Sequence, residues 1–233
     1  MQFVSRLRAA WPRIRRVMLI AAAVLLILPV VSGLALNFVQ PPTTMVMLRR
    51  TSQRAMASTK PWYPKRDVVR RADISSHLRR AVLAAEDDRF YLHWGLDVVE
   101  IQKALDRAER GGRLRGASTI TQQVAKNIFL WEGRSFVRKG LEAYCTLVLE
   151  LTLPKERILD LYLNLAEWDE GVFGAEMAAR QHFGVSAARL TREQAARLAA
   201  ILPSPRRFSP HGAYATRRAE EILARMQYAA PRR

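Results

Sequence analysis

The chain has 233 residues, enough for one sizeable domain and an additional segment. Its formal net charge of +17 makes nucleic acid, anionic lipid headgroups and phosphorylated, lipid-linked molecules the natural classes of partner. Nucleic acid is not the expected partner, because the sequence has no zinc-finger spacing or aromatic RNA-binding motif and contains a long apolar run at 17–39.

Residues 17–39 contain no charged side chain. As a helix rising roughly 1.5 Å per residue, this run would cross the roughly 30 Å hydrocarbon core of a bilayer, and membrane helices tolerate an internal proline such as Pro29. The residues before it include no acidic side chain and five basic ones, Arg6, Arg8, Arg13, Arg15 and Arg16. We therefore predict a cytoplasmic basic tail at 1–16, a transmembrane helix at 17–39 and an exported domain at 40–233.

A cleaved signal peptide is the alternative interpretation of the apolar run. We favour a retained anchor, because the run exceeds the roughly 7–15 apolar residues of a signal peptide and no clean small-x-small cleavage site closes it. Cys145 is the single cysteine and cannot form an intramolecular disulfide, so we expect a buried free thiol.

After the anchor, the segment 40–75 carries several prolines and is predicted to be mostly irregular, with a short helix near 45–48. From Ser76 onward the apolar spacing is helical and no stretch alternates as a strand would. The predicted helices are 76–88, 95–110, 118–130, 135–152, 155–168, 173–182, 191–202 and 214–228. We therefore expect an all-α exported domain.

Three adjacent carboxylates, Glu86, Asp87 and Asp88, end the first of these helices. The negative end of the helix dipole and the acidic neighbours both raise the pKa of a carboxyl group, and burial against Phe90 or Trp94 would raise it further. A raised pKa is what a general base or acid needs at neutral pH. The alternative for such a cluster is a solvated acidic turn.

His93 and Gly95 stand at fixed offsets behind these carboxylates, which a solvated turn would not require. We expect His93 to bond to the acidic turn. The other histidines, His77, His182 and His211, are isolated, and the sequence has no HExxH motif or Cys/His cluster, so a zinc site is not predicted.

The segment 116–127 reads GASTITQQVAKN and combines a helix start with a dense set of polar groups. Ser118 and Thr119 suit the N-terminal end of a helix, where orphan N–H groups also favour anions. Amides, an ammonium and hydroxyls then crowd the first turns, which is the chemistry that phosphate and sugar hydroxyls require. The alternative is a well-capped surface helix.

The segment 138–144 places Arg138 and Lys139 one helical turn before Glu142. The simplest interpretation is an ordinary helical ion pair worth roughly 0.2–0.5 kcal/mol. The alternative is an active-site carboxylate whose pKa is lowered by these cations while that of Glu86 is raised, a pairing typical of acid–base glycosyl chemistry. Arg134 and Lys139 would then supply charge for a leaving phosphate.

Three further features are assigned mainly to structure. Asn164 is predicted to be a buried amide that bonds to the backbone, and Glu176 is a weaker third candidate carboxylate. The proline-rich segment 202–210 is predicted to be an architectural turn.

These motifs resemble, in order, those of the family 51 glycosyltransferases that polymerise bacterial peptidoglycan. The matching segments are EDDRFYLHWG at 86–95, GASTITQQVAKN at 116–127, RKGLE at 138–142, KERILDLYLN at 155–164 and VFGAEMAARQHFG at 172–184. The resemblance covers about residues 60–212. Ala117 replaces a common glycine, and LPSP at 202–205 replaces the frequent LPNP, and neither change removes a functional group.

The resemblance implies an all-α, lysozyme-like domain with a small membrane-proximal jaw lobe near 128–137, preceded by the single transmembrane helix. It also implies a bacterial inner-membrane protein with a periplasmic catalytic domain. No SxxK or KTG pattern of a penicillin-binding transpeptidase is present, so a monofunctional transglycosylase is expected.

By the same resemblance, the substrates are lipid II and a lipid-linked glycan. Glu86 would take the proton from the acceptor 4-hydroxyl group as it attacks the anomeric carbon, giving a β-1,4 bond with inversion and releasing undecaprenyl pyrophosphate. Glu142 would position the acceptor or stabilise the pyrophosphate, and Lys126 would neutralise it, with Arg134 and Lys139 as weaker candidates. The other expected substrate-binding residues are Asp87, Arg89, Ser118, Gln122, Gln123, Asn127 and Arg138.

No tightly bound cofactor is expected, although Mg²⁺ or Mn²⁺ is a candidate companion of the pyrophosphate, with Asp87 nearby. Other cell-wall synthesis or division proteins are candidate partners. Two competing functions remain: a lytic muramidase of the same architecture, and a non-catalytic membrane-anchored scaffold of the wall-synthesis complex.

Overall fold

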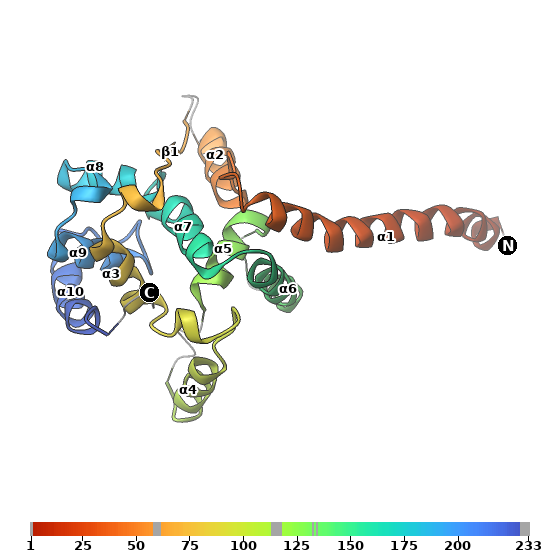
Figure 1. Ribbon diagram of the computed structural model, residues 1–233. Coiled ribbons are helices and arrows are strands. Elements are labelled where there is room, and N and C mark those ends of the chain that lie inside the picture. The colour runs from red at the N-terminus through yellow and green to blue at the C-terminus, as the bar shows by residue number, and fades with distance from the viewer. Residues whose placement is uncertain (1, 58–61, 113–117, 132, 134, 229–233) are drawn as a thin grey trace.

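The computed structural model describes residues 2–57, 62–112, 118–131, 133 and 135–228, with side chains from residue 11 onward. Arg134 and residues 116–117 of the GASTITQQVAKN segment lie outside the described residues. A long N-terminal helix, α1 (Gln2–Ala35), projects from a mostly helical body (Figure 1). The expected all-α domain behind one apolar helix is confirmed.

The body is organised around α7 (Lys155–Leu165), which is buried on almost every side, as expected of a helix at the centre of a domain (Figure 1). On one side of it lie α5 (Ile120–Phe129) and α6 (Phe136–Thr152). The bundle on the other side consists of α3 (Ser76–Glu86), α8 (Ala175–Phe183), α9 (Arg192–Ile201) and α10 (Ala213–Arg225), while α4 (Val98–Glu109) stands at the periphery.

All eight helices predicted from Ser76 onward are present, with ends that differ by a few residues. The sequence did not predict two other features: the full length of the helix after the anchor and a small sheet. The helix predicted only near 45–48 extends over thirteen residues as α2 (Met45–Ala57). Three short strands, β1 (Lys65–Arg66), β2 (Glu167–Asp169) and β3 (Val172–Phe173), form a small sheet in which β3 pairs parallel with β1 and antiparallel with β2. Three turns of 3₁₀ helix complete the fold: η1 (Arg71–Asp73), η2 (Phe90–Leu92) and η3 (Ala187–Arg189).

The helix α1 is long and apolar enough to cross a membrane over Trp11–Ala35, where the mean hydropathy reaches 2.7. The helix ends at Ala35, four residues before the predicted end of the span, and it continues without interruption through the basic tail.

The C-terminal part of α1 packs against α6. The Tyr144 hydroxyl donates to the carbonyl of Leu26 at 2.5 Å, and the Asn37 side-chain amide donates to the carbonyl of Thr152 at 2.8 Å. Between these points Gly33 allows close approach, since a Cβ atom there would lie 2.4 Å from the Thr152 Oγ1 atom. The anchor is therefore docked on the body.

Asn164 on α7 fastens the segment before α3 to the centre of the fold. The side chain is fully buried; its amide nitrogen donates to the carbonyls of Val69 and Asp160, and its Oδ1 atom accepts from the Val69 N–H. The prediction of a buried amide bonded to the backbone is confirmed. Cys145 is likewise a buried free thiol, and burial raises the pKa of its thiol to about 11.

Replacement of Asn164 by Ala should destabilise the fold, because it leaves the partly buried N–H and C=O groups of Val69 without this partner. An unsatisfied buried polar group costs about 1–3 kcal/mol, so we expect the Tm in detergent to fall by roughly 2–10 °C. The control is Gln102→Ala on the exposed face of α4, which should leave the Tm unchanged. Equal Tm values for the two variants would contradict this role of Asn164.

Candidate active site

Glu86 is the last residue of α3 and is partly buried beside α5. Its Oε2 atom accepts a hydrogen bond of 2.7 Å from the Gln123 side-chain amide. The Oε1 atom of Gln123 in turn accepts from the hydroxyl of Tyr162, which is fully buried on α7, at 3.3 Å. Because the tyrosine donates to the amide oxygen, the amide nitrogen faces the carboxylate, and three helices together fix the position of Glu86.

The environment raises the pKa of the Glu86 carboxyl group. Burial is the largest cause and outweighs the hydrogen bond from Gln123 and the charges of Arg218 and Lys126, all of which lower the pKa; the Asp87 charge adds a small increase. The predicted direction is confirmed, although burial dominates over the acidic neighbour. Of the two expected aromatic neighbours, Phe90 is buried, whereas Trp94 is 69% exposed and does not form the predicted apolar wall.

Asp87 turns inward and joins the acidic turn to the start of α5. Its Oδ1 atom lies 2.9 Å from the Nε2 atom of His93, as predicted for the histidine, and its Oδ2 atom accepts from the Ile120 N–H at 3.0 Å. Gly95 then brings the chain close to α6 with a φ of +74°, and its carbonyl accepts from the Thr119 hydroxyl. The turn is therefore an ordered, bonded structure and not a solvated loop.

A potential metal-ligand set in the described part of the chain is Asp87, His93 and Asp97, whose ligand atoms lie within 4.8 Å of one another. The carboxylates are already occupied: Asp97 accepts from Arg89 at 3.0 Å and caps the N-terminus of α4, while Asp87 bonds as described above. This arrangement does not favour a bound cation. Arg89, expected to bind substrate, is held in the ion pair with Asp97.

At the start of α5, Thr119 is the N-cap residue and forms a reciprocal pair with Gln122. The Thr119 hydroxyl accepts from the Gln122 N–H at 3.2 Å, and the Gln122 side-chain oxygen accepts from the Thr119 N–H at 3.0 Å. The predicted helix start is confirmed, and the structure places buried Gln122 in the cap. Ser118, by contrast, is exposed.

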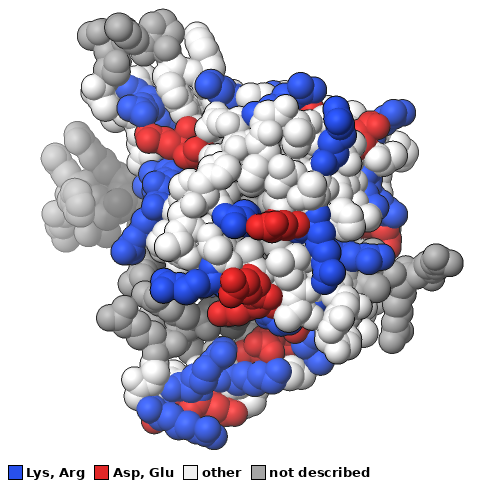
Figure 2. All heavy atoms as spheres, turned by 90° about the vertical axis from the view of Figure 1, so that its left-hand side faces the viewer, with Lys and Arg blue, Asp and Glu red and all other residues white. Residues whose placement is uncertain are grey.

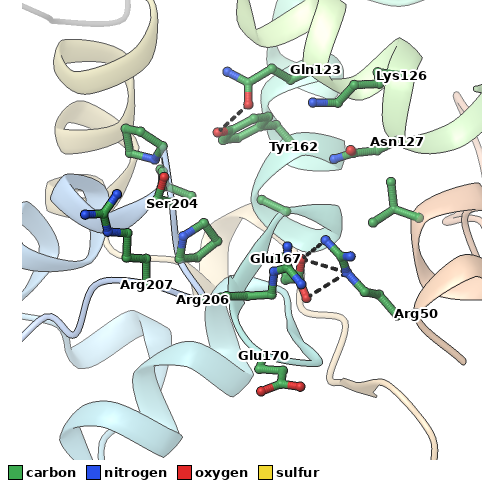
Figure 3. A pocket seen from close by; sticks show the side chains of 15 residues that line it. Arg50, Gln123, Lys126, Asn127, Tyr162, Glu167, Glu170, Ser204, Arg206 and Arg207 are labelled. Atoms are coloured by element: carbon green, nitrogen blue, oxygen red, sulfur yellow. Dashed lines mark hydrogen bonds and ion pairs between the residues drawn. The ribbon is translucent and has the colours of Figure 1, made fainter. Parts of the chain in front are cut away.

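An open cavity of about 630 Å³ lies beside α5 (Figure 3). Gln123, Lys126 and Asn127 from α5, three of the residues predicted to bind substrate, lie on one wall. The remaining walls were not predicted: they come from α2, from the end of α7 with β2, and from the loop that follows α9. These residues are Val46, Arg50, Tyr162, Ala166, Glu167, Glu170 and the loop residues Leu202, Pro203, Ser204, Pro205, Arg206 and Arg207.

Arg50 and Glu167 form an ion pair in the wall of this cavity. The Arg50 Nε atom lies 3.2 Å from each carboxylate oxygen, and its Nη2 atom lies 2.9 Å from Oε2. The exposed pair of Arg54 with Glu170 repeats the connection one turn further along α2. The segment that follows the anchor is thereby attached to the cavity wall. The segment 202–207, predicted to be an architectural turn, forms a turn and also lines the cavity.

A second cavity, of about 370 Å³, is lined by Glu86 and its neighbours in the acidic turn. Its charged lining is mixed and includes two arginines of α10, which the sequence interpretation did not select. The lining residues are Ala84, Ala85, Glu86, Asp87, Asp88, Asp97, Glu100, Arg107, Ser118, Thr119, Arg218 and Arg225. Since Gln123 lines the first cavity and Glu86 the second, their hydrogen bond lies between the two.

Glu142 is buried on α6 and bound by two cations. Arg138 lies 2.5 Å from one carboxylate oxygen and Lys139 lies 2.5 Å from the other, which confirms the predicted contacts. None of these three residues lines either of the two cavities described above, so the structure does not bring Glu142 into the same cavity as Glu86. Arg134 lies outside the described residues.

Glu176, the third candidate carboxylate, has a structural environment. It is buried, with one oxygen 2.7 Å from the Arg180 Nε atom and the other accepting from the Ala187 N–H at 2.7 Å. These bonds tie α8 to η3.

Comparison with known proteins identifies the family of the chain. The family model described as Transglycosylase matches residues 52–227. The chain is 53% identical over 195 residues to a biosynthetic peptidoglycan transglycosylase of Pseudomonas entomophila (strain L48), covering 83% of this chain and 82% of the relative. It is 52% identical over 199 residues to a protein of the same name from Pseudomonas putida (strain W619), covering 84% of each. The chain therefore belongs to the transglycosylase family.

Proposed function

We propose that this protein polymerises lipid II into β-1,4 glycan strands of peptidoglycan, with inversion at the anomeric carbon and release of undecaprenyl pyrophosphate. The proposal rests on the environment of Glu86. The pKa of its carboxyl group is raised, and the group is held by a hydrogen bond from Gln123 that joins the linings of the two cavities. Membership of the transglycosylase family and the names of the relatives support the same reaction.

In this reaction Glu86 acts as the general base. Its carboxylate accepts the proton of the acceptor 4-hydroxyl group while the hydroxyl oxygen bonds to the donor anomeric carbon and the bond to the pyrophosphate oxygen breaks. Such proton transfer contributes roughly 10²–10⁴-fold to a rate. The raised pKa suits this step, because a carboxylate of higher pKa is the stronger base once ionised.

The basic cavity beside α5 supports binding of the pyrophosphate. Lys126 supplies a cation there, and Asn127 and Gln123 supply amide groups for phosphate and sugar oxygens. Glu142 has both oxygens engaged by Arg138 and Lys139, so we assign it the orientation of these two cations and not proton transfer.

The surroundings of α1 support a single-pass anchor with a cytoplasmic N-terminus and a periplasmic catalytic domain in a bacterial inner membrane. Basic residues before the span favour that orientation. The apolar residues of the predicted jaw near 128–137 differ in exposure: Leu130 is buried, whereas Trp131, Phe136 and Val137 are exposed. Because α6 packs beside α1, the exposed apolar residues at its start and at Leu151 are positioned to meet lipid.

We also propose that any need for Mg²⁺ or Mn²⁺ arises from the substrate pyrophosphate and not from a protein-held ion. The carboxylates of Asp87 and Asp97 are engaged with protein donors, which is the support for this view.

Replacement of Glu86 by Gln should reduce polymerisation of lipid II by at least 100-fold, because the amide keeps the shape and the contact with Gln123 but does not accept the proton. The assay is the length distribution of glycan formed from lipid II, with lipid II binding measured in parallel and expected to persist. The matched control is Glu109→Gln at the exposed end of α4.

Normal polymerisation by the Glu86→Gln variant would refute the base assignment. A wild-type protein that leaves lipid II intact but shortens existing glycan would instead be a lytic enzyme. A protein that binds lipid II and neither polymerises nor cleaves would be a scaffold.

A further inference from the structure

Some cations of the domain are already paired with carboxylates. Arg50 binds Glu167, and Arg138 and Lys139 both bind Glu142. The side chains of Lys126, Arg206 and Arg207 differ: in the part of the chain that the structure describes, none of them has a hydrogen bond or an ion pair, although the charge of Lys126 lowers the pKa of Glu86. All three residues line the first cavity. Their charges are therefore available to an anion there.

Lys126 and Arg206 lie on different walls of this cavity (Figure 3). Lys126 extends from α5, whereas Arg206 reaches from the loop after α9 toward the pair of Glu167 and Arg50. The neighbouring Arg207 extends away from that pair, and its guanidinium lies 5.4 Å from the ring centre of Phe208. Of the two adjacent arginines, Arg206 is the one that faces the Glu167 side of the cavity.

The loop that carries Arg206 is held in shape. Pro203 and Pro205 restrict its backbone, the Arg207 N–H donates to the Ser204 carbonyl at 3.0 Å, and the Phe208 ring stacks on Tyr214 of α10 at 3.9 Å. A backbone that is already ordered loses less conformational entropy when the loop binds a ligand. The loop thus presents Arg206 in advance of substrate.

Nearby carboxylates do not cancel the charge of Arg206. Glu167 has both oxygens bonded to Arg50, and Glu170 is paired with Arg54 at 2.6 Å. On the face that Figure 2 shows, Lys and Arg are widespread, but there they alternate with small groups of acidic residues. Two unpaired cations on separate walls of one cavity are a more specific feature, and they suit a ligand with more than one phosphate group.

We propose that Arg206 binds the diphosphate of the lipid-linked substrate together with Lys126, each from its own wall of the cavity. The proposal rests on the proposed function and adds a residue to it. The guanidinium forms two parallel hydrogen bonds to one phosphate, while the Lys126 ammonium neutralises the other. Arg206 is a binding residue and takes no part in proton transfer.

The test uses the full-length protein in detergent and farnesyl diphosphate as the probe, with farnesol for comparison. Arg206→Gln should weaken diphosphate binding by roughly 10–100-fold, the range expected for lost hydrogen bonds to a charged group. Arg206→Lys should recover part of the loss, and Arg189→Gln, an exposed arginine on η3, should bind as the wild type does. Farnesol binding should be the same in all variants.

The double variant Lys126→Gln/Arg206→Gln should lose less than the product of the single losses, because the two residues hold one ligand. With lipid II, Arg206→Gln should raise KM while the acid limb of the pH–rate profile stays in place. Because Arg206 is exposed, its replacement should not destabilise the fold. An unchanged Tm will show that the variants remain folded.

Unchanged diphosphate binding by Arg206→Gln would overturn the proposal. So would equal losses for Arg206→Gln and Arg189→Gln, since that result would mean nonspecific attraction by the basic surface. If the wild type binds the diphosphate through Arg206 but does not polymerise lipid II, the proposed function fails and this binding site stands.

Discussion

The candidate site depends on the two hydrogen bonds of the Asp87 carboxylate. This carboxylate joins two parts of the chain that are 33 residues apart, bonding to His93 within the acidic turn and to the backbone N–H of Ile120 at the start of α5. A buried charge beside orphan N–H groups at a helix N-terminus is favourable, and hydrogen bonds to charged groups contribute about 1.5–3 kcal/mol each. This bond places the end of α3 against α5, and therefore places Glu86 against Gln123.

The two cavities have different chemistry because different elements build them. The first takes its charge from α2, α5 and the loop after α9, and its carboxylates are neutralised by arginines of α2. The second combines acidic and basic residues from the ends of α3 and α4 and from α10. An inverting transfer needs a leaving group and an attacking hydroxyl on opposite sides of the anomeric carbon. In the proposed reaction, Glu86 lines one cavity and bonds to Gln123 of the other, so each substrate has a cavity of its own.

Local sequence patterns predicted the helices, the Thr119 cap, the contacts of His93 and the ion pairs of Glu142, because each depends on residues close together in the chain or on the period of a helix. They did not predict the walls of the first cavity. Arg50 and Glu167 are 117 residues apart, and neither has a local pattern that marks the other. The short strands were missed for the same reason, since β1 is defined by its pairing with β3. In the loop 202–207, the two prolines suggested a turn, and the adjacent arginines were the signal that would have indicated a binding wall.

The most direct test of the account is the pH dependence of kcat/KM for lipid II polymerisation in the wild type and in Gln123→Leu. Glu86 must be ionised to act, so the rate should fall as the pH drops through its raised pKa. Removing the Gln123 donor destabilises the carboxylate and raises this pKa further, so the acid limb should move to higher pH, whereas Gln102→Leu should leave it in place. An acid limb that stays in place or moves to lower pH in Gln123→Leu would contradict the claim that this hydrogen bond holds the catalytic base.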